Sequence, residues 1–144
     1  MKTILCLSLS LWLLACTDMG ELTVYKYTVR NESGVGIKLR GYKTNMNTNP
    51  TIIQLGNNQE LSKTFKDGIP PRGPYGFSDF FDSDSLVVVF DSKKYLVYLW
   101  ESRCENGNER NPLNTCFHSN NEEETFTFTV EDYENAEDCT GNCE

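Results

Sequence analysis

Histidine and clustered positive charge are scarce in this sequence. Its 144 residues include one histidine and 13 Lys and Arg against 21 Asp and Glu, so the formal net charge is −8. Nucleic-acid binding depends on clustered Lys and Arg, and this composition argues against a nucleic-acid partner. The sequence also lacks a P-loop, a G-x-S-x-G nucleophile turn and an H-E-x-x-H zinc motif. We therefore expect a protein that is not an enzyme and that carries no cofactor.

Long apolar runs are missing except at the start of the chain. The uncharged, leucine-rich segment 3–15 is too short to span a bilayer, which takes about 20 apolar residues, and it is typical of a secretory signal peptide. It ends in Leu13-Leu14-Ala15-Cys16, which resembles a bacterial lipobox. In such signals the chain is cut before the cysteine, whose thiol carries a diacylglycerol. We therefore predict a cleaved lipoprotein signal peptide at residues 1–15 and lipid attachment at Cys16.

The residues that follow the lipobox indicate the localisation of the protein. Residues 16–21 are polar and predict a short lipidated tether. Several acyl chains make membrane binding durable, because each buried CH₂ adds about 0.8 kcal/mol. In the enteric-type sorting rule, an aspartate directly after the cysteine signals inner-membrane retention, and this chain has Thr17 there. We expect a lipid-anchored protein of the cell envelope, with the outer membrane favoured. The alternatives are an ordinary signal peptide that keeps Cys16 for a disulfide, or a short core helix at residues 3–15.

The remaining cysteines predict disulfides. The candidates are Cys104, Cys116, Cys139 and Cys143. An even number in an exported protein is usually paired, and four cysteines allow three connectivities. The sequence favours local pairing, first with second and third with fourth, while a crossed pairing of tail and loop stays open. A zinc site that adds His118 to the cysteines is a further alternative, although the spacing fits no standard zinc pattern.

The hydrophobic pattern beyond the tether has a period of two, which is typical of β-strands. Seven short segments separated by turn residues carry it: 22–29, 35–42, 51–55, 60–66, 85–90, 95–100 and 125–130. We predict one all-β domain over residues 22–144, a single antiparallel β-sandwich of about seven strands, immunoglobulin-like or similar. The turn residues 31–34 predict that the first two strands form a hairpin. The very apolar segment 85–90 predicts a strand in the middle of a sheet with both faces covered.

The end of the chain shows the cleanest alternation. Phe126, Phe128 and Val130 are expected to point inward, with threonines between them pointing outward. Residues 131–138 predict one or two helical turns that are too polar to contribute to the core. From residue 121 to the end there are acidic residues and no Lys or Arg. An acidic segment of this kind is usually a solvated face, although it could steer a cationic partner.

A segment rich in proline, glycine and aromatic residues follows the fourth predicted strand. Function is often carried by loops on a rigid scaffold, and aromatic residues are frequent at binding hot spots, so this segment is a candidate binding loop. Its candidate residues are Arg72, Tyr75, Phe77, Phe80 and Phe81. The alternative, which we favour, is that the rings fold back and plug one end of the sandwich, since a small core needs large apolar groups.

Two further groups were considered as metal ligands. Asp79, Asp82 and Asp84 could offer oxygen atoms to calcium, but the glycine and the closing glutamate of a calcium loop are missing. Aspartate is also an ordinary turn residue before a strand, so we expect no metal there. His118 lies in a polar segment without a flanking motif, which predicts a solvated loop histidine.

Several segments together resemble small uncharacterised lipoproteins of Bacteroidota-type bacteria. The resemblance rests on the lipobox, the strand pattern and the segments 61–71, 110–114 and 126–139. It implies a lipoprotein of the envelope and carries over no activity or site residue. We therefore expect a non-enzymatic binding or structural accessory module, with a membrane partner through its lipid and a protein partner at the envelope. The alternative is an inhibitor or immunity-type protein that blocks an enzyme through the aromatic loop or the acidic tail.

Overall fold

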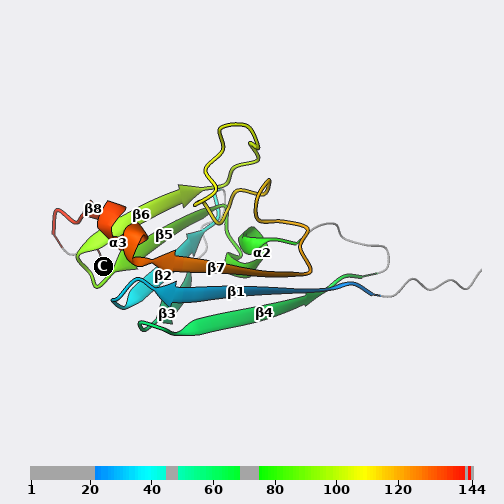
Figure 1. The fold of residues 1–144 in the computed structure, drawn as a ribbon, viewed down its shortest axis with the longest axis horizontal. Helices are drawn as coiled ribbons and strands as arrows, with labels where there is room; N and C mark the ends of the chain where they lie inside the picture. Colours follow the sequence, from blue (N-terminus) through cyan, green and yellow to red (C-terminus); the bar gives the residue numbers. More distant parts are fainter. Residues whose placement is uncertain (1–21, 45–48, 69–74, 142, 144) are drawn as a thin grey trace, which may run out of the picture.

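The structure, a computed structural model, describes residues 22–44, 49–68, 75–141 and 143 (Figure 1). The chain is mostly β, with two sheets and few helices, as the all-β prediction requires. The strands are β1 (Val24–Glu32), β2 (Ile37–Tyr42), β3 (Thr51–Leu55), β4 (Glu60–Lys66), β5 (Ser85–Phe90), β6 (Lys94–Leu99), β7 (Glu123–Thr129) and β8 (Glu137–Asp138). The helices are α2 (Phe77–Phe81) and α3 (Val130–Asn135).

The expected signal peptide and tether, including Cys16, lie outside the described residues. Within the described ranges, no helix is both long enough and apolar enough to cross a membrane. All seven predicted strands are present, and β3 and β4 have the predicted bounds. The strands form a three-stranded sheet in the order β4-β1-β7 and a five-stranded sheet in the order β3-β2-β5-β6-β8.

Strand pairing differs from the prediction at two places. The β1 and β7 strands run parallel, so the expectation of a purely antiparallel fold is wrong for this pair. Parallel neighbours need a long connection, and here most of the chain lies between the two strands. The predicted hairpin of the first two strands is also wrong, because β1 pairs with β4 and β7 whereas β2 pairs with β3 and β5.

Asn31 explains why the chain changes sheets instead of forming that hairpin. Its side chain is fully buried, and its amide nitrogen donates to the carbonyl oxygens of Val35 at 2.7 Å, Leu55 at 3.1 Å and Gly56 at 3.0 Å. Its amide oxygen accepts from the backbone and the hydroxyl of Ser33. The side chain thus satisfies backbone groups at a corner, where the strand ladder of neither sheet reaches them.

One core cluster takes residues from both sheets and both helices or their flanks. Alternate residues of each strand point into it: Tyr27, Val29, Ile37, Leu39, Leu86, Val88, Phe90, Phe126 and Phe128. The strand β5 lies in the middle of its sheet, as predicted, between β2 and β6. On its other face Val89 is covered, but Val87 is only half-buried, so the expectation that both faces are covered holds in part.

The segment after β7 corrects two expectations about the chain end. Val130 begins α3 and is 49% exposed, so it does not continue the inward row of Phe126 and Phe128. The predicted helical turns are present, but they contribute to the core. The ring of Tyr133 lies 5.8 Å from that of Phe90, and Ala136 is buried. The polar sequence hid this contact, because only two apolar side chains of the segment face inward.

Candidate functional site

The proline-aromatic segment is part of the core where the structure describes it. Tyr75, Phe77, Phe80 and Phe81 are each 7% exposed or less. The short helix α2 carries three of these rings, and Phe77 lies edge-on to Tyr27 at 5.1 Å. This burial corrects the binding-loop interpretation, because the rings are unavailable at the surface and fill the inside as the favoured alternative expects. Arg72 lies outside the described residues.

The acidic residues proposed for calcium are not brought together. The carboxylate of Asp79 accepts from the backbone of Gly76 at the start of α2. Asp82 pairs with Lys43. Asp84 accepts from the backbone and the hydroxyl of Thr44, both at 2.7 Å, and these bonds lower its pKa. The described residues contain no group of three His, Cys, Asp or Glu placed to hold a metal ion.

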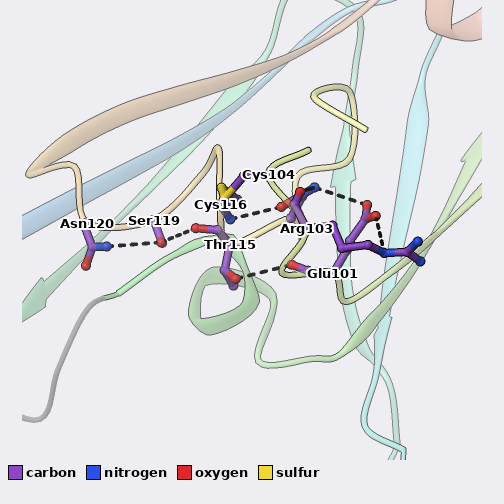
Figure 2. Close-up of a disulfide and its surroundings, with 8 residues drawn as sticks. Glu101, Arg103, Cys104, Thr115, Cys116, Ser119 and Asn120 are labelled. Atoms are coloured by element: carbon purple, nitrogen blue, oxygen red, sulfur yellow. Dashed lines mark hydrogen bonds and ion pairs between the residues drawn. A yellow bond between two sulfur atoms is a disulfide. The ribbon is translucent and has the colours of Figure 1, made fainter. Parts of the chain in front are cut away.

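Both disulfides of the favoured local pairing are present: Cys104 with Cys116, and Cys139 with Cys143. The first closes residues 104–116, which we call the disulfide loop. Figure 2 shows how the chain around it is bonded: Thr115 donates its backbone N–H to the Glu101 carbonyl at 2.8 Å, and Glu101 pairs with Arg103. The amide of Asn114 also donates to the Arg103 carbonyl at 3.1 Å. The loop is therefore held by a covalent bond and by its own polar network.

His118 is not the solvated histidine that the sequence suggested. Its side chain is 15% exposed and lies 5.4 Å from the Phe126 ring, edge-on. Its Nδ1 atom is 2.6 Å from the Glu124 carboxylate, and its Nε2 atom is 2.8 Å from the Glu109 carbonyl oxygen. No sequence motif indicates this setting, because Glu109 and Glu124 meet the ring only through the folding of the disulfide loop against β7.

The ionisation of His118 follows from this setting. Burial alone lowers the pKa of an imidazole, but hydrogen bonds to Glu124 and to the Glu109 carbonyl, together with the Glu124 charge, raise the pKa of His118 above its ordinary value. The nearby guanidinium of Arg110 opposes that rise. Both nitrogens of the ring are already bonded to acceptors, so His118 is not placed as a base beside a nucleophile.

The outer face of the three-stranded sheet is mostly polar, and two of its cations are paired within it. Lys26 pairs with Glu123 at 3.5 Å, and Arg30 pairs with Glu60 at 2.8 Å. The hydroxyl of Thr28 lies 2.7 Å from another hydroxyl on β4. This face satisfies its own polar groups and is the ordinary solvated face of a sheet.

The outer face of the five-stranded sheet is different, and we call it the open face. One row of side chains crosses four strands in register, from Ile52 through Arg40 and Val87 to Val97. The next row ends in Leu99 at the β6 side. The exposed apolar residues of the open face are Tyr42 at 37%, Ile52 at 54%, Val97 at 52% and Leu99 at 64%, and Trp100, 53% exposed, follows directly at the end of β6. Such a contiguous apolar surface is typical of interaction sites.

Two cations lie among these apolar side chains. Lys38 and Arg40 are half-buried on β2, and within the described part of the chain neither makes an ion pair or a side-chain hydrogen bond. Each end of the open face is hollowed. At one end, the residues that line a pocket of about 340 Å³ include Lys38, Gln54 and Val89. At the other end, the residues that line a pocket of about 350 Å³ include Trp100, Arg103 and Asn108. Apolar rows, unpaired cations and two hollows thus share one surface.

Comparisons with protein families, curated proteins and solved structures found no match for this chain. The site therefore has to be argued from its own geometry. The sequence analysis missed the open face, although a signal was there. The predicted strand 95–100 is apolar or aromatic at every position, which makes both of its faces apolar. A strand with a solvated outer face would alternate with polar residues.

Proposed function

We propose that this protein is a lipid-anchored lipoprotein of the cell envelope whose β-sandwich domain binds a partner protein through the open face, without enzymatic chemistry. The observation that carries the proposal is the contrast between the two outer sheet faces. One pairs Lys26 and Arg30 with carboxylates of the same face, while the other displays Ile52, Val97 and Leu99 to solvent. Exposing such rows is unfavourable by roughly 25 cal/mol per Å² of apolar area, a cost that a partner removes on binding.

The charge on the open face indicates the chemistry of the partner. Lys38 and Arg40 lack carboxylate partners within the described residues, in a chain whose formal net charge is −8. A partner surface that carries apolar side chains and carboxylates would complement both features. Anionic lipid would also meet the two cations, but the net negative charge of the domain opposes its approach to such a membrane. We therefore favour a protein partner.

The anchor part of the proposal rests on the sequence. The lipobox-like end at Cys16 supplies a lipid attachment site, and Thr17 favours the outer membrane under the enteric-type rule. The paired cysteines 104 with 116 and 139 with 143 support an oxidising compartment, since disulfides persist mainly outside the cytoplasm. A sandwich held by such bonds on a lipidated tether would present its open face close to other envelope proteins.

The non-enzymatic part rests on how the reactive groups are used. His118 bonds acceptors at both nitrogens, and the three candidate aspartates are each bonded to different donors. The inhibitor alternative loses its main support, because the aromatic rings of the proposed blocking loop are buried. An accessory module that binds through a sheet face is therefore the better reading.

Photo-crosslinking in cells that produce the full-length protein tests the binding face. A photoreactive residue at Val97 lies on the open face, and one at Thr64 is the matched control, an exposed strand residue on the outer face of the other sheet. We expect protein adducts from position 97 and not from position 64. The substitutions Lys38→Glu and Arg40→Glu should reduce those adducts, and mass spectrometry should find carboxylates and apolar residues in the crosslinked peptide.

Three results would contradict this proposal: adducts of equal yield from both positions, adducts only with lipid, and adducts only with a second copy of the chain.

The anchor is tested separately by the intact mass of the membrane-fraction protein. We expect loss of residues 1–15 and a gain of several acyl chains, both absent from a Cys16→Ala variant. A mature protein without acyl chains would remove the lipoprotein claim and leave the open face to be judged on its crosslinks.

A further inference from the structure

Three neighbouring segments of the chain meet at the His118 ring. Glu124 belongs to β7, Glu109 belongs to the disulfide loop, and His118 follows that loop. The ring is packed edge-on to Phe126 at 5.4 Å and to Phe77 at 6.0 Å, so it has little freedom to turn. Its two hydrogen bonds link Glu109 of the disulfide loop to β7, beside the bonds that the next residue, Arg110, makes to the Thr127 carbonyl and to Asp132.

The two hydrogen bonds of His118 depend on the number of protons that the ring carries. The Glu109 carbonyl oxygen can only accept, so Nε2 must carry a hydrogen. The pair formed by Nδ1 and the Glu124 carboxylate, 2.6 Å apart, needs one more proton between them. When that proton is lost, the neutral ring has a single N–H for two acceptors. One of the two bonds then breaks, and an unpaired acceptor faces the lone pair of a ring nitrogen.

We propose that His118 is a proton-dependent latch that holds the disulfide loop against β7 and releases it when the ring becomes neutral. The charged bond to Glu124 is the stronger of the two, because hydrogen bonds to an ionised group are about twice as strong as neutral ones. The remaining N–H therefore stays on Nδ1, and the bond to the Glu109 carbonyl is the one that is lost. The loop is released at Glu109 and the residues before it, while its disulfide, the Asn114 bonds and the bonds of Arg110 to Thr127 and Asp132 keep the rest of the loop in place.

The surrounding charged groups are compatible with this latch. Glu124 also accepts from the Asn121 amide at 3.0 Å, which holds the carboxylate in place in both states. The Arg110 guanidinium lies 4.8 Å above the Phe126 ring and opposes the positive charge on His118. Tyr27 on the neighbouring strand β1 has a pKa raised to about 12 by burial and by the Glu124 charge, so it stays neutral throughout. The helix α2 contributes only the uncharged Phe77 ring.

The latch also bears on the open face. Arg103 and Asn108 line the pocket of about 350 Å³ beside Trp100, and Asn108 belongs to the disulfide loop. Release of the loop at Glu109 changes that wall of the pocket. This consequence for binding rests on the proposed function, whereas the latch itself does not.

Nuclear magnetic resonance of the protein with intact disulfides tests the latch without any partner. The chain has one histidine, so the ring ¹⁵N signals belong to His118 without ambiguity. We expect both ring nitrogens to be protonated at pH 6, with a midpoint above the ordinary value of about 6.5. The amide signals of Glu109 and Arg110 should shift with the same midpoint, and amide exchange in residues 105–110 should rise above it.

Two variants make the result specific. Glu124→Gln removes the charge that favours the imidazolium, so it should lower the midpoint. Because its amide can donate to the neutral Nδ1 and leave Nε2–H on the Glu109 carbonyl, it should also uncouple the loop from the titration of the ring. His118→Gln should abolish the loop transition. A neutral ring at pH 6, or loop amides that do not follow the His118 midpoint, would overturn the latch, and the native protein alone decides both points. Crosslinks from position 97 do not depend on the latch, so a failure of the latch and a failure of the proposed binding face can be told apart.

Discussion

The guanidinium of Arg110 forms an ion pair with the carboxylate of Asp132, whose side chain is only 8% exposed. The same carboxylate accepts the backbone N–H of Thr129 at 2.7 Å and so caps the start of α3. Arg110 also donates to the Thr127 carbonyl at 2.9 Å, on the edge of β7. One side chain thereby ties the disulfide loop to the last helix and covers backbone that an edge strand would otherwise expose.

Loss of this pair should destabilise the fold. Arg110→Met keeps an unbranched apolar side chain but removes the guanidinium, which lies over Phe126 and pairs with Asp132, and so leaves the nearly buried carboxylate with fewer donors. We expect the free energy of unfolding to fall by about 1–3 kcal/mol, less than for a fully buried pair because the guanidinium itself is half exposed. Lys26→Met removes the exposed pair with Glu123 and should cost about 0–1 kcal/mol. If urea denaturation showed equal losses of unfolding free energy for the two variants, the larger contribution assigned to the Arg110–Asp132 pair would be contradicted.

Asn31 makes a second sharp prediction. Asn31→Ala leaves the carbonyl oxygens of Val35, Leu55 and Gly56 without their buried donor. Because an unsatisfied buried polar group costs about 1–3 kcal/mol, we expect unfolding to become easier by about 2–4 kcal/mol. The control is Asn57→Ala, which removes one exposed bond to the Gly34 backbone and should change stability by less than about 1 kcal/mol. Chemical denaturation followed by circular dichroism measures both.

The role of Asn31 also shows where sequence reasoning stops. Strand positions follow from local alternation of apolar and polar residues, which is why all seven predicted segments are strands. Strand partners depend on distant contacts, such as the bond from Asn31 to the Leu55 carbonyl, 24 residues further along the chain. The turn residues 31–34 look the same whether the next strand pairs back or crosses to another sheet.

The candidate site, like the fold, can be predicted only in part from the sequence. The sequence contains the reason for the two disulfides, because short separations favour local pairing. The sequence also contains the apolar outward positions of β6, which the lack of alternation with polar residues indicates. It does not reveal that Lys38 and Arg40 lack ion-pair partners among the residues that the structure describes, since that depends on which strands lie beside β2. Nor does it bring Glu109 to His118, a contact made by the folded loop.

Gly41 on β2 offers a test of close packing. A Cβ atom added there would lie 2.8 Å from the Phe81 carbonyl oxygen and 2.9 Å from the Ser83 side chain. Gly41→Ala should therefore force the end of α2 away from β2 and reduce stability by about 1–3 kcal/mol. Gly36→Ala is the control, because its Cβ meets only one atom at 4.0 Å, and we expect a change within about 0.5 kcal/mol. Similar melting temperatures for the two variants would contradict the packing at Gly41.

The pH dependence of stability gives the last prediction. The folded-state pKa of His118 is raised, so its contribution to stability is fully present below about 6.5 and is lost as the pH rises through the folded value. Asp84 has a lowered pKa, and its contribution changes only in acid. The raised pKa values of Lys93 and Tyr95 place their titrations in strong alkali. Between pH 6 and pH 8.5 the native protein should therefore lose stability through His118, whereas His118→Gln should stay nearly level. Parallel denaturation midpoints for the two proteins across this range would show that the buried histidine is not ionised in the fold.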